Sequence, residues 1–88
     1  MGQSPRQRPA KLAAKLKSIR ARLNLTQSQM ADALQESKAG LQSGHVSEYE
    51  SGKREPSLII LLRYSRLAKI AVEVLIDDEL ELPKRLQR

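Results

Sequence analysis

Residues 25–58 read LTQSQMADALQESKAGLQSGHVSEYESGKREPSL, and this stretch decides where the central helices of the chain begin and end. Thr26 is followed three residues later by Gln29, which is the pattern of a capping box. Leu25 before the cap and Met30 four residues after it can form a hydrophobic staple. The stretch therefore predicts that a helix begins directly after Thr26.

This helix is predicted to continue through Met30 and Ala31 to Leu34. The residues that follow allow two interpretations. Residues 35–39 either lengthen the helix by a turn or are extra residues in the turn, and Gly40 then stops the helix. The sequence alone leaves both interpretations open.

A further short helix is predicted over residues 43–51. Gln42 or Ser43 can cap its start, since both side chains can hydrogen-bond to backbone groups there. Val46 and Tyr49 are three residues apart and are expected to face the core from the same side of this helix.

The chain beyond this helix carries strong boundary signals. Gly52 stands at the usual position of a helix-ending glycine. Pro56 prevents continuation, and Ser57 can cap a fourth helix. The predicted buried face of the fourth helix consists of Leu58, Leu61, Leu62, Ser65 and Ala68. A fifth helix is predicted over residues 72–78, with the apolar set Val72, Leu75 and Ile76.

Before the quoted stretch, a first helix is predicted from Pro9 to about Leu23, because proline is tolerated in the first turn. Asn24 can adopt the left-handed conformation that ends a helix. The predicted inner face carries Leu12, Leu16, Ile19 and Leu23, spaced by four, three and four residues. The other faces are expected to hold Lys11, Lys15, Lys17, Ala21 and Arg22.

These elements predict an all-α domain of five helices over residues 9–78. A flexible basic arm is expected over residues 1–8, and an extended C-terminal tail over residues 79–88. With no Phe or Trp and only two Tyr among 88 residues, the core must be aliphatic, which suits short packed helices better than a sheet.

Composition excludes several classes of function. The chain has no cysteine, so disulfides and thiolate metal sites are absent, and the single histidine, His45, argues against a metal site. The apolar run over residues 58–62 is too short to span a membrane, and the N-terminal residues lack the apolar region of a secretory signal. We expect a soluble cytoplasmic protein with no cofactor.

The net charge of +6 is unevenly distributed. No acidic residue occurs in residues 1–22, which contain Arg6, Arg8, Lys11, Lys15, Lys17, Arg20 and Arg22. No basic residue occurs in residues 77–81, which contain Asp77, Asp78, Glu79 and Glu81. A basic half attracts a polyanion such as DNA, although charged helix faces can also be simply solvated.

Two motifs occur in combination: Thr26-Gln27-x-x-Met30-Ala31, and then Tyr49-Glu50-x-Gly52-Lys53-Arg54-x-Pro56. With them, residues 16–76 resemble the lambda-repressor-like (Xre/Cro type) helix-turn-helix family. Further matching residues are Ile19, Arg20, Leu25, Leu34, Val46, Ser47, Ser51, Ser57, Leu58, Leu61, Leu62, Leu75 and Ile76. The resemblance implies the five-helix lambda-repressor-like fold and sequence-specific binding of double-stranded DNA.

In such a domain, the recognition helix places its N-terminal residues in the major groove. With Val46 and Tyr49 directed inward, the residues expected to face bases are Gln42, Ser43, Gly44, Ser47 and Glu48. Gln can read adenine, Ser can read several bases, and Glu can accept from cytosine N4. Alternatively, Ser43 only caps the helix, and Glu48 only forms a surface pair with Lys53 or Arg54.

The residues expected to contact phosphates are Gln27, Lys53, Arg54 and Ser57. Gln27 lies in the first turn of its helix, where backbone N–H groups favour an anion, and the resemblance implies that it also supports the recognition helix. The resemblance further implies that Arg20 and Glu50 form a structural pair. Arg6 and Arg8 on the arm either reach the DNA or belong to a merely basic tail.

The sequence departs from the family pattern in the turn and on the later helices. Residues 35–39 make the turn longer, so the sequence does not determine the angle at which the recognition helix docks on DNA. We hypothesise that this insertion projects near the DNA. Lys69 and Ala71 replace the usual glycine and serine. Apolar side chains occur where polar ones are usual, at Ile59, Ile60 and Val74. They indicate either a two-fold homodimer through the fourth and fifth helices or packing against the insertion or tail.

The leading hypothesis is a transcriptional regulator, repressor-like and bacterial or phage-like, associated with the nucleoid. The alternative is a protein-interaction module on the same fold, such as a coactivator, adaptor or antitoxin with a protein partner. An enzyme is not expected, because no nucleophile–base pair, metal cluster or phosphate-binding glycine loop is present in the sequence. RNA binding is less favoured because the sheet-borne aromatics that stack on bases are lacking.

Overall fold

Helix α2 (Gln27–Leu34) begins at the predicted capping box. The Thr26 hydroxyl accepts from the Gln29 backbone N–H at 3.0 Å, and the Gln29 side chain accepts from the Thr26 N–H at 2.8 Å. The computed structural model describes residues 9–35 and 41–85. Within them the chain forms five helices, which confirms the predicted all-α fold.

The end of α2 shows whether the helix continues into residues 35–39, at least for the first of these residues. Gln35 is extended rather than helical, so α2 is not lengthened at this position. The Gln35 side-chain amide donates to the carbonyls of Ala31 at 3.2 Å and Leu41 at 3.0 Å. The Arg63 guanidinium donates to the Leu34 carbonyl at 2.8 Å. These bonds satisfy carbonyls at the end of α2, while residues 36–39 of the proposed insertion lie outside the described residues.

Helix α3 (Ser43–Ser51) has the predicted bounds, with Gln42 as its N-cap residue. The Gln42 backbone N–H donates to Nδ1 of His45 at 3.1 Å. Gly52 ends the helix at a φ of 81°, a left-handed conformation that glycine adopts without steric cost.

Helix α4 (Leu58–Ala68) starts where Ser57 predicted, and the Ser57 hydroxyl accepts from the Ile60 N–H at 3.2 Å. It ends at Lys69, which takes the left-handed conformation at a φ of 59° in place of the usual glycine. Helix α5 (Val72–Ile76) is shorter than the predicted 72–78, because Asp77 already has an extended backbone.

Helix α1 (Leu12–Arg22) starts later than predicted and has no side-chain cap of its own. The missing cap comes from Asp78, whose carboxylate accepts from the backbone N–H of Ala10 at 2.8 Å and of Lys11 at 3.0 Å. In the other direction, Lys15 donates from Nζ to three carbonyls that follow or end α5: Val74 at 2.7 Å, Asp77 at 3.0 Å and Leu80 at 2.8 Å. The two helices therefore cap each other.

The prediction that Lys15 lies on an outer face was wrong, since its residue is only 7% exposed. The buried position follows from the three carbonyls, which replace the water that an ammonium group requires. Burial of the aliphatic stem against the core adds apolar contact.

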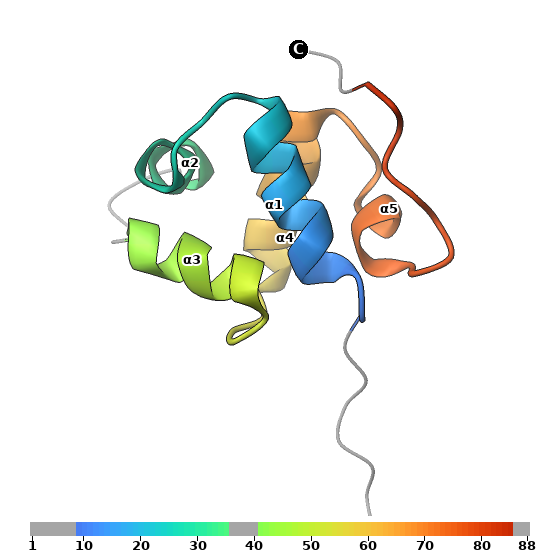
Figure 1. Cartoon of the computed structure of the whole chain (residues 1–88), viewed down its shortest axis with the longest axis horizontal. Helices are drawn as coiled ribbons and strands as arrows, with labels where there is room; N and C mark the ends of the chain where they lie inside the picture. Colours follow the sequence, from blue (N-terminus) through green and yellow to red (C-terminus); the bar gives the residue numbers. More distant parts are fainter. Residues whose placement is uncertain (1–8, 36–40, 86–88) are drawn as a thin grey trace, which may run out of the picture.

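Helices α2 and α3 lie on one side of α1 and α5 lies on the other (Figure 1). The core is built by side chains from all five helices. Its fully buried large side chains are Leu16, Ile19, Met30, Leu34, Val46, Tyr64 and Leu75. Tyr64 was not part of the predicted buried face of α4. After α5, the chain passes along α1: Leu82 packs against the core, and the Arg22 guanidinium donates to the Pro83 carbonyl.

Several predicted apolar positions are corrected by the structure. Leu58 is 82% exposed, because it stands at the first residue of α4, beyond the edge of the core. Val72 and Ile76 of α5 are also exposed, and only Leu75 of that helix is buried. Of the positions predicted to point outward, Ile59 is exposed, whereas Ile60 packs partly against the core and Val74 is half-buried.

No helix in the described ranges combines the length and the apolar character that crossing a membrane requires. Across residues 9–35 and 41–85, no group of three His, Asp or Glu side chains is placed to hold a metal ion.

Candidate nucleic-acid interface

The first turn of α3 presents small and polar groups to solvent. Gln42, Ser43, Gly44 and Ser47 are all exposed, and Val46 on the opposite face is fully buried. A side chain added at Gly44 would meet no atom within 4 Å, so packing inside the protein does not require glycine there. The exposed surface can thus make hydrogen bonds to a ligand. At Gly44 it also allows the ligand to approach the helix backbone closely.

Arg20 and Glu50 tie α3 to α1. The Arg20 guanidinium donates from Nε to Glu50 Oε2 at 2.6 Å and from Nη2 to Oε1 at 3.1 Å, and a third bond goes to the Leu25 carbonyl at 2.9 Å. Only 4% of the Glu50 side chain is exposed. Hydrogen bonding to Glu50 raises the pKa of Arg20 above its ordinary value, so the guanidinium stays charged.

Gln27 belongs to the same network. Its side-chain amide donates to Glu50 Oε1 at 3.3 Å, which connects the first turn of α2 to the last turns of α3. This network fixes the rotation of α3 about its own axis, because Glu50 is held from α1 and α2 at the same time.

Tyr64 lies directly beneath this network. Its hydroxyl group is buried and has no hydrogen-bond partner among the described residues. Burial, and to a lesser degree the Glu50 carboxylate, raises the pKa of Tyr64 well above its ordinary value of 10. The phenol therefore stays neutral and serves as packing under the Arg20–Glu50 pair.

The residues predicted to contact phosphates fall into two groups, one beside α3 and one in the loop that follows it. Gln27 lines a hollow of about 350 Å³ together with Lys17, Arg20, Ser47, Glu50 and Ser51. Lys17 was not singled out from the sequence as a contact residue, although its position three residues before Arg20 places both on one face of α1.

The second group surrounds the loop between α3 and α4. Lys53, Arg54 and Ser57 line a groove of about 600 Å³ that also contains Pro9. Both Lys53 and Arg54 are exposed, and Ser57 marks the N-terminus of α4, which favours an anion.

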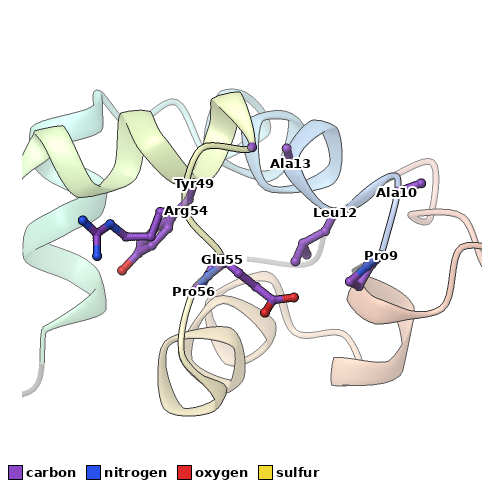
Figure 2. Close-up of a pocket in the computed structure, with 9 residues that line it drawn as sticks. Pro9, Ala10, Leu12, Ala13, Tyr49, Arg54, Glu55 and Pro56 are labelled. Atoms are coloured by element: carbon purple, nitrogen blue, oxygen red, sulfur yellow. The ribbon is translucent and has the colours of Figure 1, made fainter. Parts of the chain in front are cut away.

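Arg54 contacts Glu48 of α3. Its Nε donates to Glu48 Oε1 at 2.8 Å, and its backbone N–H donates to the Glu48 carbonyl at 3.3 Å. The side-chain bond from Arg54 lowers the pKa of Glu48 below its ordinary value. In Figure 2 the Arg54 side chain extends back beneath α3, while Glu55 points the opposite way, toward Pro9.

The same loop borders a smaller hollow of about 210 Å³ at the start of α1 (Figure 2). It is lined from one side by Pro9, Ala10, Leu12 and Ala13, and from the other by Tyr49, Gly52, Arg54, Glu55 and Pro56. Pro9 therefore lies beside the Arg54 loop, and the chain that precedes Pro9 joins the domain at this point.

Comparisons with known proteins agree with this arrangement. A structure of the P22 c2 repressor protein in complex with synthetic operator 9T has a TM-score of 0.65 and 18% sequence identity to the chain, covering 76% of this chain and 94% of that chain. At this identity the likeness concerns the fold. A comparison with curated protein sequences found no significant match. A helix-turn-helix family model matches residues 16–75, more than half of the chain. The chain belongs to this helix-turn-helix family, the Xre or lambda-repressor-like group that its motifs resemble.

Proposed function

We propose that this chain is a sequence-specific regulator of transcription that binds double-stranded DNA, with α3 as its recognition helix. The observation that carries the proposal is the pairing of two features on α3. Its N-terminal turn is polar and exposed, while its other end is locked to α1 and α2 through Glu50. A recognition helix reads bases in the major groove with the polar residues of its N-terminal turn, and it must be held rigidly to do so.

The charge around α3 supports DNA as the ligand. Gln27 and Lys17 lie beside Ser47 and Glu50 of this helix, and Lys53, Arg54 and the start of α4 line a separate groove beyond its C-terminal end. Contacts to phosphates set the register and orientation of a recognition helix on the duplex. The net charge of +6 adds long-range attraction.

Base reading is assigned to Gln42, Ser43, Gly44 and Ser47. Phosphate contact is assigned to Gln27, Lys53, Arg54 and Ser57. The role of Glu48 is separate, because its carboxylate is already engaged by Arg54.

The basic arm over residues 1–8, with Arg6 and Arg8, lies outside the described residues. Its attachment point supports a role on DNA, because Pro9 lines the same groove as Lys53 and Arg54. An arm that starts there begins beside the proposed phosphate contacts.

A second copy of the chain is the proposed occupant of the apolar surface on α4 and α5. Leu58 is 82% exposed, Ile59 56%, Ile76 45% and Val72 37%. These two helices pack on each other. Leu58 and Ile76 line one groove, whereas Ile59 lines a separate hollow with Ala33 of α2. A two-fold dimer would present two copies of α3 to half-sites about one DNA turn apart.

Selection of binding sites from a random pool of duplexes tests the function directly. We expect an enriched sequence with two-fold symmetry, and binding that weakens steeply as salt rises. Variants of Lys53 should weaken binding to every sequence, whereas variants of Gln42, Ser43 or Ser47 should change the selected sequence. Failure to enrich any sequence, together with salt-independent binding, would exclude this function.

The same exposed apolar surface also favours the second candidate, a protein-interaction module such as a coactivator, adaptor or antitoxin. In that case, the surface would bind a different protein and the chain would bind DNA weakly. Sedimentation distinguishes the candidates, because the regulator should sediment as a dimer on its selected DNA without any other protein.

A further inference from the structure

Glu48 and Arg54 join the two surfaces that the proposed function uses. Glu48 is on α3, among the residues that sequence placed toward the bases, and Arg54 belongs to the loop assigned to phosphates. Their side chains meet at 2.8 Å, and the 3.3 Å bond from the Arg54 backbone to the Glu48 carbonyl holds the loop against α3.

This ion pair has two consequences for DNA binding. The guanidinium donates to a carboxylate instead of a phosphate. The carboxylate oxygen in turn accepts from Arg54 instead of from the amino group of a base. Both side chains are largely exposed, 41% for Glu48 and 57% for Arg54. An exposed pair of this kind is weak and exchanges its partners readily.

We propose that Glu48 is a specificity-determining residue that acts through Arg54. This inference rests on the proposed function. On DNA without a donor opposite Glu48, the carboxylate retains Arg54 and keeps one cation away from the phosphates. Where a cytosine N4 amino group faces Glu48, that group replaces Arg54 as donor, and Arg54 turns to a phosphate.

The alternative is that Glu48 merely repels DNA as one negative charge among others. The two possibilities differ in their dependence on Arg54. Repulsion persists when Arg54 is absent, whereas retention of Arg54 has no effect without it. A double-mutant cycle separates them.

The experiment compares the wild-type chain with Glu48→Gln, Arg54→Gln and the double variant, on a random duplex over a range of salt concentrations. Glu48→Gln should bind this duplex about two- to fivefold more tightly, the factor that corresponds to the strength of an exposed ion pair. The slope of log K against log salt should steepen by about 0.9, which corresponds to one additional phosphate contact. In the Arg54→Gln background, Glu48→Gln should change neither quantity.

Glu79→Gln is the matched control, because it removes one exposed negative charge from the segment after α5. An equal gain in this control, or an equal gain from Glu48→Gln in both backgrounds, would overturn the inference. So would the absence of any gain.

Site selection provides the second measurement. The wild-type chain should select cytosine at one position of each half-site, and Glu48→Gln should lose this preference. Retention of the cytosine by the variant would contradict the inference alone, since DNA binding itself would persist. A wild-type chain that binds no duplex would overturn the proposed function as well.

Discussion

At the scale of single residues, α3 contains positions where folding and DNA binding make opposite demands. Gly44 lies in the first turn of the helix with open space around its Cα, so the fold gains nothing from a missing side chain. Gly52 ends the same helix at a positive φ, where the fold does need glycine. Replacing each glycine by alanine therefore distinguishes a glycine that serves DNA binding from one that the fold requires.

Gly44→Ala should raise the free energy of unfolding by up to about 1 kcal/mol, because alanine loses less backbone entropy in a helix. The same change should weaken binding to the selected DNA, since the added methyl group stands between the backbone and the groove. Urea unfolding and binding isotherms measure the two effects. As a control, Gly52→Ala should lower stability by about 1–2 kcal/mol through the left-handed conformation. Unchanged DNA affinity in Gly44→Ala would refute the close approach.

Glu50→Ala should destabilise the domain by about 3–5 kcal/mol, because it leaves the Arg20 guanidinium without its carboxylate in a mostly buried site. Replacing both residues, as Arg20→Met with Glu50→Leu, should cost less than Glu50→Ala alone, since no charge is then stranded. Chemical denaturation gives both values. A loss below about 1 kcal/mol for Glu50→Ala would place the pair with ordinary surface ion pairs instead.

At the scale of elements, the molecule depends on the exchange of caps between α1 and α5. Helix α1 lacks an acidic residue in its first turn and a cap of its own, and α5 has only five residues. A helix that short is unstable in isolation. Lys15 and Asp78 therefore hold the two helices together at their ends, in addition to the apolar contact made by Leu75.

Lys15→Met should retain the apolar stem but remove the ammonium group from the Val74, Asp77 and Leu80 carbonyls. We expect a loss of about 2–3 kcal/mol, the range for hydrogen bonds to a charged group whose partners become unsatisfied. Amide hydrogen exchange should show α5 losing protection before α1 and α4. Uniform loss of protection across all helices would contradict this local role, and Lys17→Met, at an exposed position of the same helix, is the control.

Asp78→Asn should remove a pH-dependent part of the stability. Hydrogen bonds from the backbone of Ala10 and Lys11 lower the pKa of Asp78 below its ordinary value of 3.8. A depressed pKa means that the stabilisation is complete above pH 3.8 and disappears as the pH falls through the folded-state value. Unfolding of the wild-type and variant chains should thus differ by a constant amount near neutral pH and converge in acid. A difference that persists unchanged throughout the acid range would argue against this cap.

At the scale of the whole molecule, two faces with different chemistry emerge. Helix α3 lies toward one side of α1, and α5 lies on the other side (Figure 1). The apolar residues Leu58, Ile59, Val72 and Ile76 are supplied by α4 and α5. Leu58 and Ile76 also line the groove of Lys53, Arg54 and Ser57, so the proposed surfaces for DNA binding and self-association adjoin there.

Leu58→Gln combined with Ile76→Gln should leave folding nearly unchanged, because both side chains are substantially exposed. The variant should sediment as a monomer and lose affinity for a two-half-site duplex. Its binding to a single half-site measures any separate effect on the phosphate groove that both residues line. Leu61→Gln is the contrasting control, since Leu61 is 5% exposed and should instead destabilise the fold. A wild-type chain that is monomeric both free and on DNA would exclude the dimer.

The starts of α2 and α4, both ends of α3 and the family of the chain were predictable from the sequence. The reason is that capping boxes, serine caps and helix-ending glycines act within three or four residues, so their partners are visible in the local order of the chain. The polar face of α3 follows in the same way from the spacing of Val46 and Tyr49. Whether Gln35 extended α2 was left open, because its amide bridges to Leu41 beyond the insertion.

Only the tertiary structure decided which residues serve the distant ends of the helices and which exposed charges meet. The partners of Asp78 lie 67 and 68 residues away, and those of Lys15 lie 59 to 65 residues away. Helical periodicity assigns a face to such residues but not the segment that covers it. Tyr64 in the core and Leu58 at its edge depend equally on where α1 and α5 lie. The local sequence thus determined the helices, the recognition surface and the candidate partners of Glu48, because all of these depend on residues close together in the chain. Long-range packing determined the caps that α1 and α5 exchange, because Lys15 and Asp78 find their partners at the other end of the chain.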